Sequence, residues 1–283
     1  MKKIVLLSMV LSLIFAVACK NPSMRNTNTI APIAKKKSTT LKKHGDTRID
    51  NYFWMRLTDE QKNAAKKDIQ TQEVYDYLEA ENNYYEDVMG FTKPFSEKLF
   101  EEMKGRIKED DESVPYKDNG YFYITRYKKG DQYPIYSRKK ETLATEEEIL
   151  FDVNKEARDF EYFQLGGLNV SPNNKLVAFA TDTVSRRQYV LQIKNLETGN
   201  IYSDKIENTT GGSVWANDNK TLFYTKKDPL TLRSYKIFKH ILGTDVSEDI
   251  EVYHEKDDTF NVSLYKTKSD KYVMLESTST VSS

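Results

Sequence analysis

The chain has 283 residues, and its 43 Lys and Arg balance its 43 Asp and Glu. This zero net charge lacks the basic excess that nucleic-acid binding uses, so we expect no nucleic-acid partner. Aromatic residues make up 12% of the chain, which excludes disorder for most of it. One cysteine and three histidines exclude a disulfide framework and a cysteine-rich zinc site, and we expect no metal and no cofactor.

Residues 1–18 are predicted to be a signal peptide. Two lysines precede an uncharged, mainly apolar run that suits an export signal better than a membrane span of about 20 residues. The Ala-Val-Ala-Cys sequence that ends at Cys19 resembles a bacterial lipobox, so Cys19 is the candidate lipidation site. The alternatives are a plain export signal or a cysteine without a role.

Residues 19–37 are polar, rich in Asn, Pro and Lys, and without periodicity, which predicts a tether. No second apolar run is long enough to span a bilayer. We therefore expect an exported lipoprotein of the bacterial cell envelope, facing the periplasm and held at the membrane by its lipid.

Residues 38–112 are predicted to form an N-terminal helical region with two amphipathic helices, at about 70–88 and 94–108. The first should stop near Gly90, with Thr92 as N-cap of the second and Pro94 in its first turn. We interpret both apolar stripes as core packing rather than as a cofactor site. The stripes consist of Val74, Tyr77, Leu78, Tyr85 and Val88, and of Phe95, Leu99, Met103 and Ile107.

From Pro115 onward the hydrophobic period changes to two, which is typical of strands. Residues 121–125 and 133–137 flank a Lys-Lys-Gly-Asp turn and predict a β-hairpin. A Leu-Glu-Thr-Gly sequence ending at Gly199 predicts a second hairpin turn.

The chain then repeats itself. Residues 170–179 align with 215–224 and, less closely, with 266–275, around lysines 45 and 51 residues apart at Lys175, Lys220 and Lys271. Repeats of this period built from short strands are the signature of β-propeller blades. The predicted fold is mainly β: residues 113–283 form an incomplete propeller, with blades near 115–160, 165–208 and 211–250 and the start of a fourth.

An ordered series of short motifs resembles oligopeptidase B, a branch of the prolyl oligopeptidase family of serine peptidases. The resemblance covers about residues 31–283 and favours the basic-specific branch over the proline-specific one. The motifs are His44-Gly-Asp-x-Arg48-x-Asp50-x-Tyr52-x-Trp54-x-Arg56, Tyr77-Leu-Glu-Ala-Glu-Asn82-x-Tyr84, Glu102-Met-x-x-Arg106-Ile107, Ser113-Val-Pro115, Leu165-Gly166, Val170-Ser-Pro172, Trp215-Ala216, Leu222-Phe-Tyr-Thr225, Leu242-Gly-Thr244 and Val252-Tyr-His-Glu255-x-Asp257-x-x-Phe260.

The resemblance implies a seven-bladed propeller that caps an α/β-hydrolase domain, with the N-terminal helices packed on that domain. It implies hydrolysis of short peptides after Arg or Lys, with the propeller gating substrate access. The catalytic Ser, Asp and His would all lie in the C-terminal domain, which is missing here. The expected partners are short peptide substrates and the chain's own C-terminal domain, besides the membrane.

No catalytic residue is therefore predicted within the chain, and we expect the 283 residues alone to be inactive. A nucleophile elbow needs Gly-x-Ser-x-Gly, whereas the segment around Ser213 lacks the second glycine and predicts a blade-entry turn. His254-Glu255 begins like a zinc motif, but Asp258 stands in the place of the second histidine. We interpret His44 and His240 as structural, and the pairs Asp110-Asp111 and Asp257-Asp258 as solvated loops.

Two hypotheses remain open. In the first, the chain is the N-terminal part of an oligopeptidase-B-like peptidase, cut short by a fragmentary gene, a premature stop or an incomplete record. In the second, it is a stand-alone lipoprotein propeller that binds a peptide or a partner. A proline-specific member of the same family is a further alternative.

Overall fold

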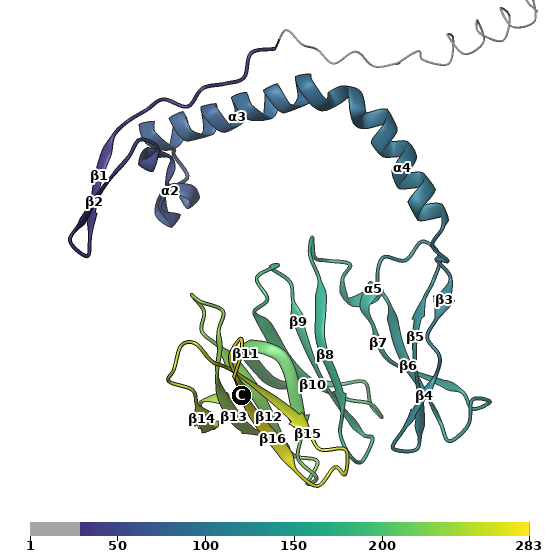
Figure 1. Cartoon of the computed structure of the whole chain (residues 1–283). Coiled ribbons are helices and arrows are strands. Elements are labelled where there is room, and N and C mark those ends of the chain that lie inside the picture. The colour runs from purple at the N-terminus through teal and green to yellow at the C-terminus, as the bar shows by residue number, and fades with distance from the viewer. Residues whose placement is uncertain (1–28, 283) are drawn as a thin grey trace, which may run out of the picture. The chain divides into compact units, whose positions relative to one another are not determined.

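The computed structural model describes residues 29–282, which form two compact units divided between Ile107 and Lys108 (Figure 1). The candidate lipidation site Cys19 lies outside the described residues. Within residues 29–282, no helix has the length and apolar character needed to span a membrane.

The first unit contains a β-hairpin and two long helices, with short helical turns between them. The predicted helices at 70–88 and 94–108 are confirmed with ends shifted by one to three residues, whereas the hairpin was not foreseen; His44 lies in its turn. The elements are β1 (Thr39–Lys43), β2 (Asp46–Asp50), η1 (Phe53–Met55), α2 (Asp59–Asn63), α3 (Ile69–Met89), η2 (Gly90–Thr92) and α4 (Lys93–Gly105).

Side-chain caps and one tryptophan organise this unit. The carboxylate of Asp68 accepts a hydrogen bond from the backbone N of Thr71 and caps the start of α3. Gly90 follows the end of α3 as predicted. Thr92 precedes α4, but its hydroxyl donates to the carbonyl of Met89 instead of capping α4. The buried Trp54 donates its indole N–H to the carbonyl of Lys35 at 2.8 Å, which ties the described end of the tether to this unit.

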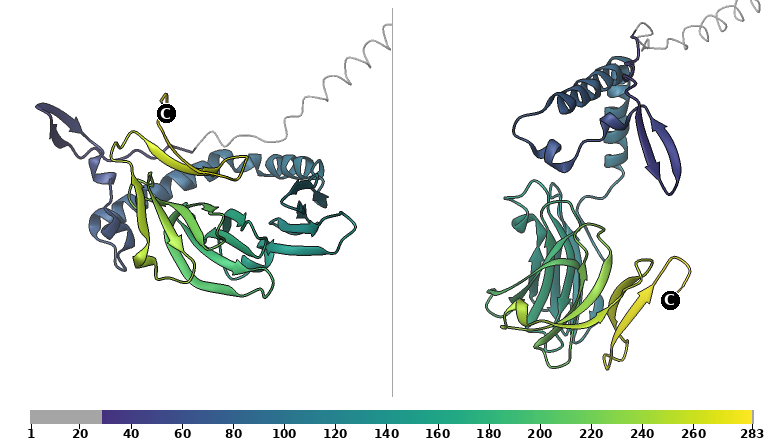
Figure 2. Two further views of the ribbon diagram at one scale, coloured as in Figure 1. Left: turned by 90° about the horizontal axis from the view of Figure 1, so that it is seen from below. Right: turned by 90° about the vertical axis from the view of Figure 1, so that its left-hand side faces the viewer.

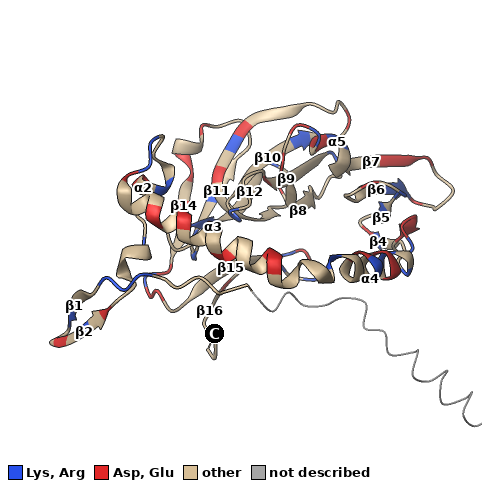
Figure 3. Ribbon diagram, turned by 90° about the horizontal axis from the view of Figure 1, so that it is seen from above, with Lys and Arg blue, Asp and Glu red and all other residues tan. Residues whose placement is uncertain are grey.

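The apolar stripes of α3 and α4 are only partly covered. Val74 and Val88 are buried, as core packing requires, but no residue of α4 is. Within the described residues the stripe predicted as core packing around α4 is therefore exposed: Phe95 is 63% exposed, and Ile107, two residues after the helix, is 67% exposed. Figure 3 shows charged residues interspersed with uncharged ones along both helices.

The second unit is built from antiparallel sheets, seen from two further directions in Figure 2. In blade 1, two short strands share one neighbour and continue into a meander that contains the predicted hairpin. The helix α5 (Val153–Glu156) follows it. The strands are β3 (Asp111–Glu112), β4 (Tyr116–Asp118), β5 (Tyr121–Tyr127), β6 (Ile135–Lys140) and β7 (Glu147–Asp152).

Blades 2 and 3 form one seven-stranded sheet because the 15-residue strand β11 belongs to both. Its first part pairs with β10 and its last part pairs with β12. The predicted blade-entry turn around Ser213 is thus wrong: Gly211 and Gly212 lie within a continuous strand, whose register shifts between Thr209 and Ser213. The strands are β8 (Gln164–Val170), β9 (Leu176–Asp182), β10 (Tyr189–Asn195), β11 (Ile201–Trp215), β12 (Thr221–Lys227), β13 (Ser234–Ile241) and β14 (Ile250–His254), with η3 (Val246–Glu248) before β14.

The strands β15 (Asn261–Lys266) and β16 (Val273–Thr278) pair with each other and open blade 4. β15 lies beside β11, β12 and β13. The described unit thus holds three blades and the first two strands of a fourth, which confirms the predicted fold class.

Two buried apolar clusters hold the blades together. One joins blades 1 and 2 through Phe151 and Phe179, whose ring centroids are 5.0 Å apart. The other fills blades 2 and 3 around Leu191, Trp215 and Leu222. Burial of such side chains stabilises each by about 1.5–3 kcal/mol relative to exposure, so neighbouring blades fold on one another.

Candidate functional site

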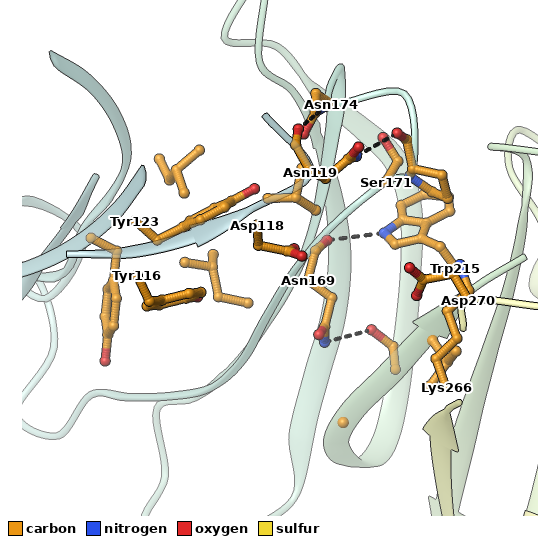
Figure 4. Close-up of a pocket in the computed structure, with 18 of the residues that line it drawn as sticks. Tyr116, Asp118, Asn119, Tyr123, Asn169, Ser171, Asn174, Trp215, Lys266 and Asp270 are labelled. Atoms are coloured by element: carbon orange, nitrogen blue, oxygen red, sulfur yellow. Dashed lines mark hydrogen bonds between the residues drawn. The ribbon is translucent and has the colours of Figure 1, made fainter. Parts of the chain in front are cut away.

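A pocket of about 840 Å³ lies against the first strands of all four blades. These strands are β4, β8, the end of β11 and β15, so residues from 116 to 270 converge on one space (Figure 4). Aromatic side chains supply much of its wall: Tyr116, Tyr123, Tyr136, Trp215 and Tyr265. A pocket with aromatic walls and a few polar groups is the form expected of a ligand or substrate path.

Blade 1 contributes a stacked pair of tyrosines. Tyr116 and Tyr123 are direct partners in the pairing of β4 with β5, and their rings stack with centroids 5.3 Å apart. Asp118 lies two residues after Tyr116 and therefore on the same face of the strand. Burial raises the pKa of both tyrosine hydroxyls, Tyr116 also through Asp118, so the two rings stay neutral at physiological pH.

Blades 2 and 3 meet at a hydrogen-bonded junction in the pocket. The indole N–H of Trp215 donates to the carbonyl oxygen of Asn169 at 2.9 Å. The side-chain amide of Asn169 donates to the Ser213 hydroxyl at 3.3 Å. Ser213 thus stands inside β11 and is bonded to an amide, an arrangement that joins two strands.

The pocket lining contains three charged residues, Asp118, Lys266 and Asp270. The ammonium group of Lys266 donates to the side-chain oxygen of Asn217 at 2.7 Å. The wall is thus mainly aromatic and neutral polar, which suits an uncharged peptide backbone.

The sequence repeats correspond to the turns after the first strand of each blade. Asn174, Asn219 and Asp270 occupy the same place in blades 2, 3 and 4, each with φ between 57° and 63°, and Asn119 is the blade 1 counterpart with φ 41°. Asparagine and aspartate tolerate this left-handed conformation better than most residues. The internal repeat in the sequence did not reveal the turn at Asn119, because glycine follows Asn119 where the other three turns have lysine.

These turns are hydrogen-bonded from blade to blade. The Asn119 amide donates to the Pro172 carbonyl at 2.7 Å, and the Asn174 amide donates to the Asn119 carbonyl at 3.1 Å. The backbone N of Asn173 donates to Asn219 Oδ1 at 2.7 Å, and the Asn217 amide donates to the Asp270 carbonyl at 2.8 Å. The repeated polar turns therefore fix the spacing of the four blades at one end of the first strands.

The Glu255-x-Asp257-x-x-Phe260 motif holds the crossover from blade 3 to blade 4. Arg233 donates to the carbonyl oxygens of Asp257, Phe260 and Glu255 at 2.8–3.2 Å. The Glu255 carboxylate accepts hydrogen bonds from the Ser277 hydroxyl, the Asp257 backbone N and the Tyr253 hydroxyl. These donors, Ser277 first, lower the pKa of Glu255 to about 2. The motif has a structural role in this chain.

The other candidate residues lie apart from the pocket. His254 ends β14 and contacts the Tyr235 ring edge-on. Asp111 pairs with Lys108 at 2.7 Å, and Asp257 caps its own loop through Thr259. His240 is buried between two aspartates. Within residues 29–282, no three His, Cys, Asp or Glu side chains are grouped so that they could hold a metal ion.

The comparisons with known proteins agree with this architecture. The chain is 38% identical over 266 residues to dipeptidyl aminopeptidase BI from Pseudoxanthomonas mexicana, covering 89% of this chain and 36% of that protein. It is 31% identical to protease 2 from Moraxella lacunata, with the same coverage. The structure of oligopeptidase B from Leishmania major matches with a TM-score of 0.75 and 30% identity, over 88% of this chain and 36% of that one.

The chain thus spans 36% of the length of each of these relatives. Residues 32–283 also match the family described as prolyl oligopeptidase, N-terminal beta-propeller domain. The chain belongs to the prolyl oligopeptidase family of serine peptidases, of which it comprises the N-terminal propeller region.

Proposed function

We propose that this chain is the propeller portion of an oligopeptidase-B-like serine endopeptidase that hydrolyses short peptides after Arg or Lys. The observation that carries the proposal is the likeness to oligopeptidase B over 88% of the chain at 30% identity. The propeller's task is to gate access, because a ring of blades admits an extended peptide and excludes a folded protein. The catalytic Ser, Asp and His belong to the C-terminal domain.

The pocket supports a gating role. It is lined by the first strand of each blade and by neutral polar and aromatic groups that can contact a passing peptide without holding it tightly. The Trp215 to Asn169 hydrogen bond and the hydrogen bonds between the repeat turns hold the strands that line it in place. A preformed path of this kind filters substrate by size, and lowering the chemical barrier is left to the catalytic domain.

The exposed stripe of α4 is the proposed contact with the C-terminal domain. Phe95 and Met103 of α4 are each more than half exposed, and so is Ile107, two residues after the end of the helix. Several exposed apolar side chains on one surface favour burial against a partner. We assign this stripe to the chain's own α/β-hydrolase domain.

Three other possibilities are outcomes of the same test. The similarity to dipeptidyl aminopeptidase BI favours release of dipeptides as a second candidate activity. A proline-specific peptidase and a stand-alone lipoprotein propeller that binds a peptide or partner remain the other two.

The test compares the 283-residue chain with a version extended through the coding sequence that follows Ser283. Both are incubated with a blocked fluorogenic peptide ending in Arg, a blocked one ending in Pro, and a dipeptide substrate with a free amino terminus. We expect the extended protein to cleave the Arg substrate and a serine-directed inhibitor to abolish the cleavage. If the extended protein cleaves the Pro or the dipeptide substrate faster than the Arg substrate, the proposed specificity for Arg and Lys is wrong. A stop codon directly after Ser283 would favour the stand-alone propeller.

Turnover by the 283-residue chain that the inhibitor abolishes, with the labelled serine mapped inside residues 29–282, would contradict the assignment of catalysis to the C-terminal domain.

A further inference from the structure

A fully buried histidine joins blades 2 and 3. His240, in β13, has no exposed surface, and its Nε2 atom lies 2.8 Å from Asp204 Oδ1 in the blade 2 part of β11. Its Nδ1 atom lies 2.6 Å from Asp249 Oδ1, just before β14 of blade 3. Both aspartate side chains are themselves almost completely buried.

The proton count of this cluster is constrained by its geometry. A neutral imidazole has one N–H donor and one acceptor nitrogen, whereas here each ring nitrogen faces a carboxylate oxygen. Each of the two short contacts therefore needs its own proton. Both of these protons are on the ring when the two aspartates are charged.

The remaining contacts support charged aspartates. Asp204 Oδ1 also accepts from the Gly243 backbone N at 2.7 Å, and Asp249 Oδ2 accepts from the Tyr224 hydroxyl at 2.8 Å. Asp204 Oδ2 is buried without a hydrogen-bond partner among the described residues, so the donors that stabilise this carboxylate, His240 and Gly243, act through Oδ1. Burial, with Asp249 next, raises the pKa of Tyr224 and keeps that hydroxyl a donor.

We propose that His240 is a buried imidazolium that locks blade 2 to blade 3 and thereby positions β11 in the pocket. The connection to the pocket runs through paired backbones. Leu222 pairs with His240 on one side and with Trp215 on the other, and Trp215 lines the pocket. A chain of three adjacent strands thus links the charge lock to the Trp215 to Asn169 hydrogen bond.

The two tryptophans of the chain make the lock measurable. Trp215 reports on the pocket, and Trp54 reports on the first unit, where its indole donates to Lys35. Substitution of His240 by Gln keeps polarity but cannot donate to both aspartates with an imidazolium's charge. Substitution of His254 by Gln is the matched control, since that histidine lies one strand away and is 35% exposed.

The experiment is nitrogen and proton NMR of the full chain, labelled at His and Trp, at pH 7. We expect two protonated, slowly exchanging ring nitrogens for His240 in the wild type. In His240→Gln and in Asp204→Asn, we expect exchange of the Trp215 indole proton to rise about tenfold or more while that of Trp54 is unchanged. His254→Gln should leave both indoles unchanged.

A neutral His240 ring, with one bare nitrogen, would overturn the proposal without recourse to any variant. An unchanged Trp215 signal in both variants would do the same. If His240→Gln fails to fold, the ring-nitrogen signals of the wild type and the Trp215 signal of the isosteric Asp204→Asn variant still test the proposal.

Discussion

Arg138 and Glu148 form a two-bond ion pair in which the arginine is almost completely buried. Arg138 Nε lies 2.8 Å from Glu148 Oε2, and Nη2 lies 3.0 Å from Oε1. The guanidinium also donates to the backbone carbonyl of Asn174 at 2.8 Å and stacks on the Tyr121 ring. One side chain of blade 1 therefore holds the repeat turn of blade 2.

Arg138→Met should destabilise the second unit by about 2–3 kcal/mol. The change leaves the Asn174 carbonyl without this donor and Glu148 without its partner. The estimate is below that for a fully buried pair because the Glu148 side chain is 36% exposed. Urea unfolding followed by circular dichroism measures it, with the exposed turn variant Lys129→Met as control. Equal midpoints for the two variants would show that the ion pair has no such role.

The sequence allowed the blade class and the helix positions to be predicted because both depend on local periodicity. The lysine repeats located three of the four turns, and Gly199 marked a hairpin correctly. The continuity of β11 was missed, since a Gly-Gly pair predicts a break when the paired strands on either side are unknown.

Non-local contacts account for the remaining differences. His240 meets Asp249 and Asp204 across 9 and 36 residues, so no spacing in the sequence indicates the lock. The pocket likewise combines side chains from seven separate strands, and only the packing of the blades on one another brings Tyr116 and Lys266 to one space. The exposure of the α4 stripe was not predictable, because amphipathic periodicity does not say what covers a helix face.

Acid should weaken the crossover between blades 3 and 4 through Glu255. Its pKa is lowered from 4.5 to about 2 by hydrogen bonds from Ser277, Asp257 and Tyr253. A carboxylate with a depressed folded-state pKa stabilises the fold above its unfolded value, and the contribution disappears as pH falls from about 4.5 toward 2. The difference in unfolding free energy between wild type and Glu255→Gln should therefore shrink across that range.

The measurement is urea unfolding at several pH values between 2 and 6, expressed as a difference from wild type. Glu146→Gln is the control, because it removes a carboxylate from an exposed loop residue of blade 1. If the difference in unfolding free energy between wild type and Glu255→Gln stays constant across this pH range, the Glu255 carboxylate is not the cause of the acid sensitivity.

Cys19→Ser should release the exported chain from membranes. The lipobox-like sequence predicts lipid on Cys19, the one cysteine of the chain. A single acyl chain binds a membrane only marginally, so stable anchoring requires at least two. Fractionation of cells expressing wild type and Cys19→Ser tests this, with Ser23→Ala in the same segment as control. Identical membrane fractions for wild type and Cys19→Ser would contradict lipidation at this residue.

Gly167→Ala should disrupt the contact between the first strands of blades 2 and 3, whereas Gly212→Ala should be tolerated. A Cβ atom on Gly167 would lie 2.1 Å from the backbone carbonyl oxygen of Gly211, a separation that requires one of the two strands to move. Gly211 has φ +92°, and the Tyr189 ring lies 3.2 Å from where its own Cβ would be, so the β11 backbone has little freedom to give way.

Gly167→Ala should therefore cost about 3 kcal/mol of stability and perturb the Trp215 to Asn169 hydrogen bond. At Gly212 the nearest atom to an added Cβ is 3.8 Å away and φ is not positive, so alanine there should change stability by less than about 1 kcal/mol. The two glycines lie on facing strands and receive the same methyl group, so the comparison isolates the steric clash. Urea unfolding and the Trp215 indole NMR signal measure both effects. Equal tolerance of the two substitutions would contradict the close approach of β8 to the Gly211 carbonyl oxygen of β11.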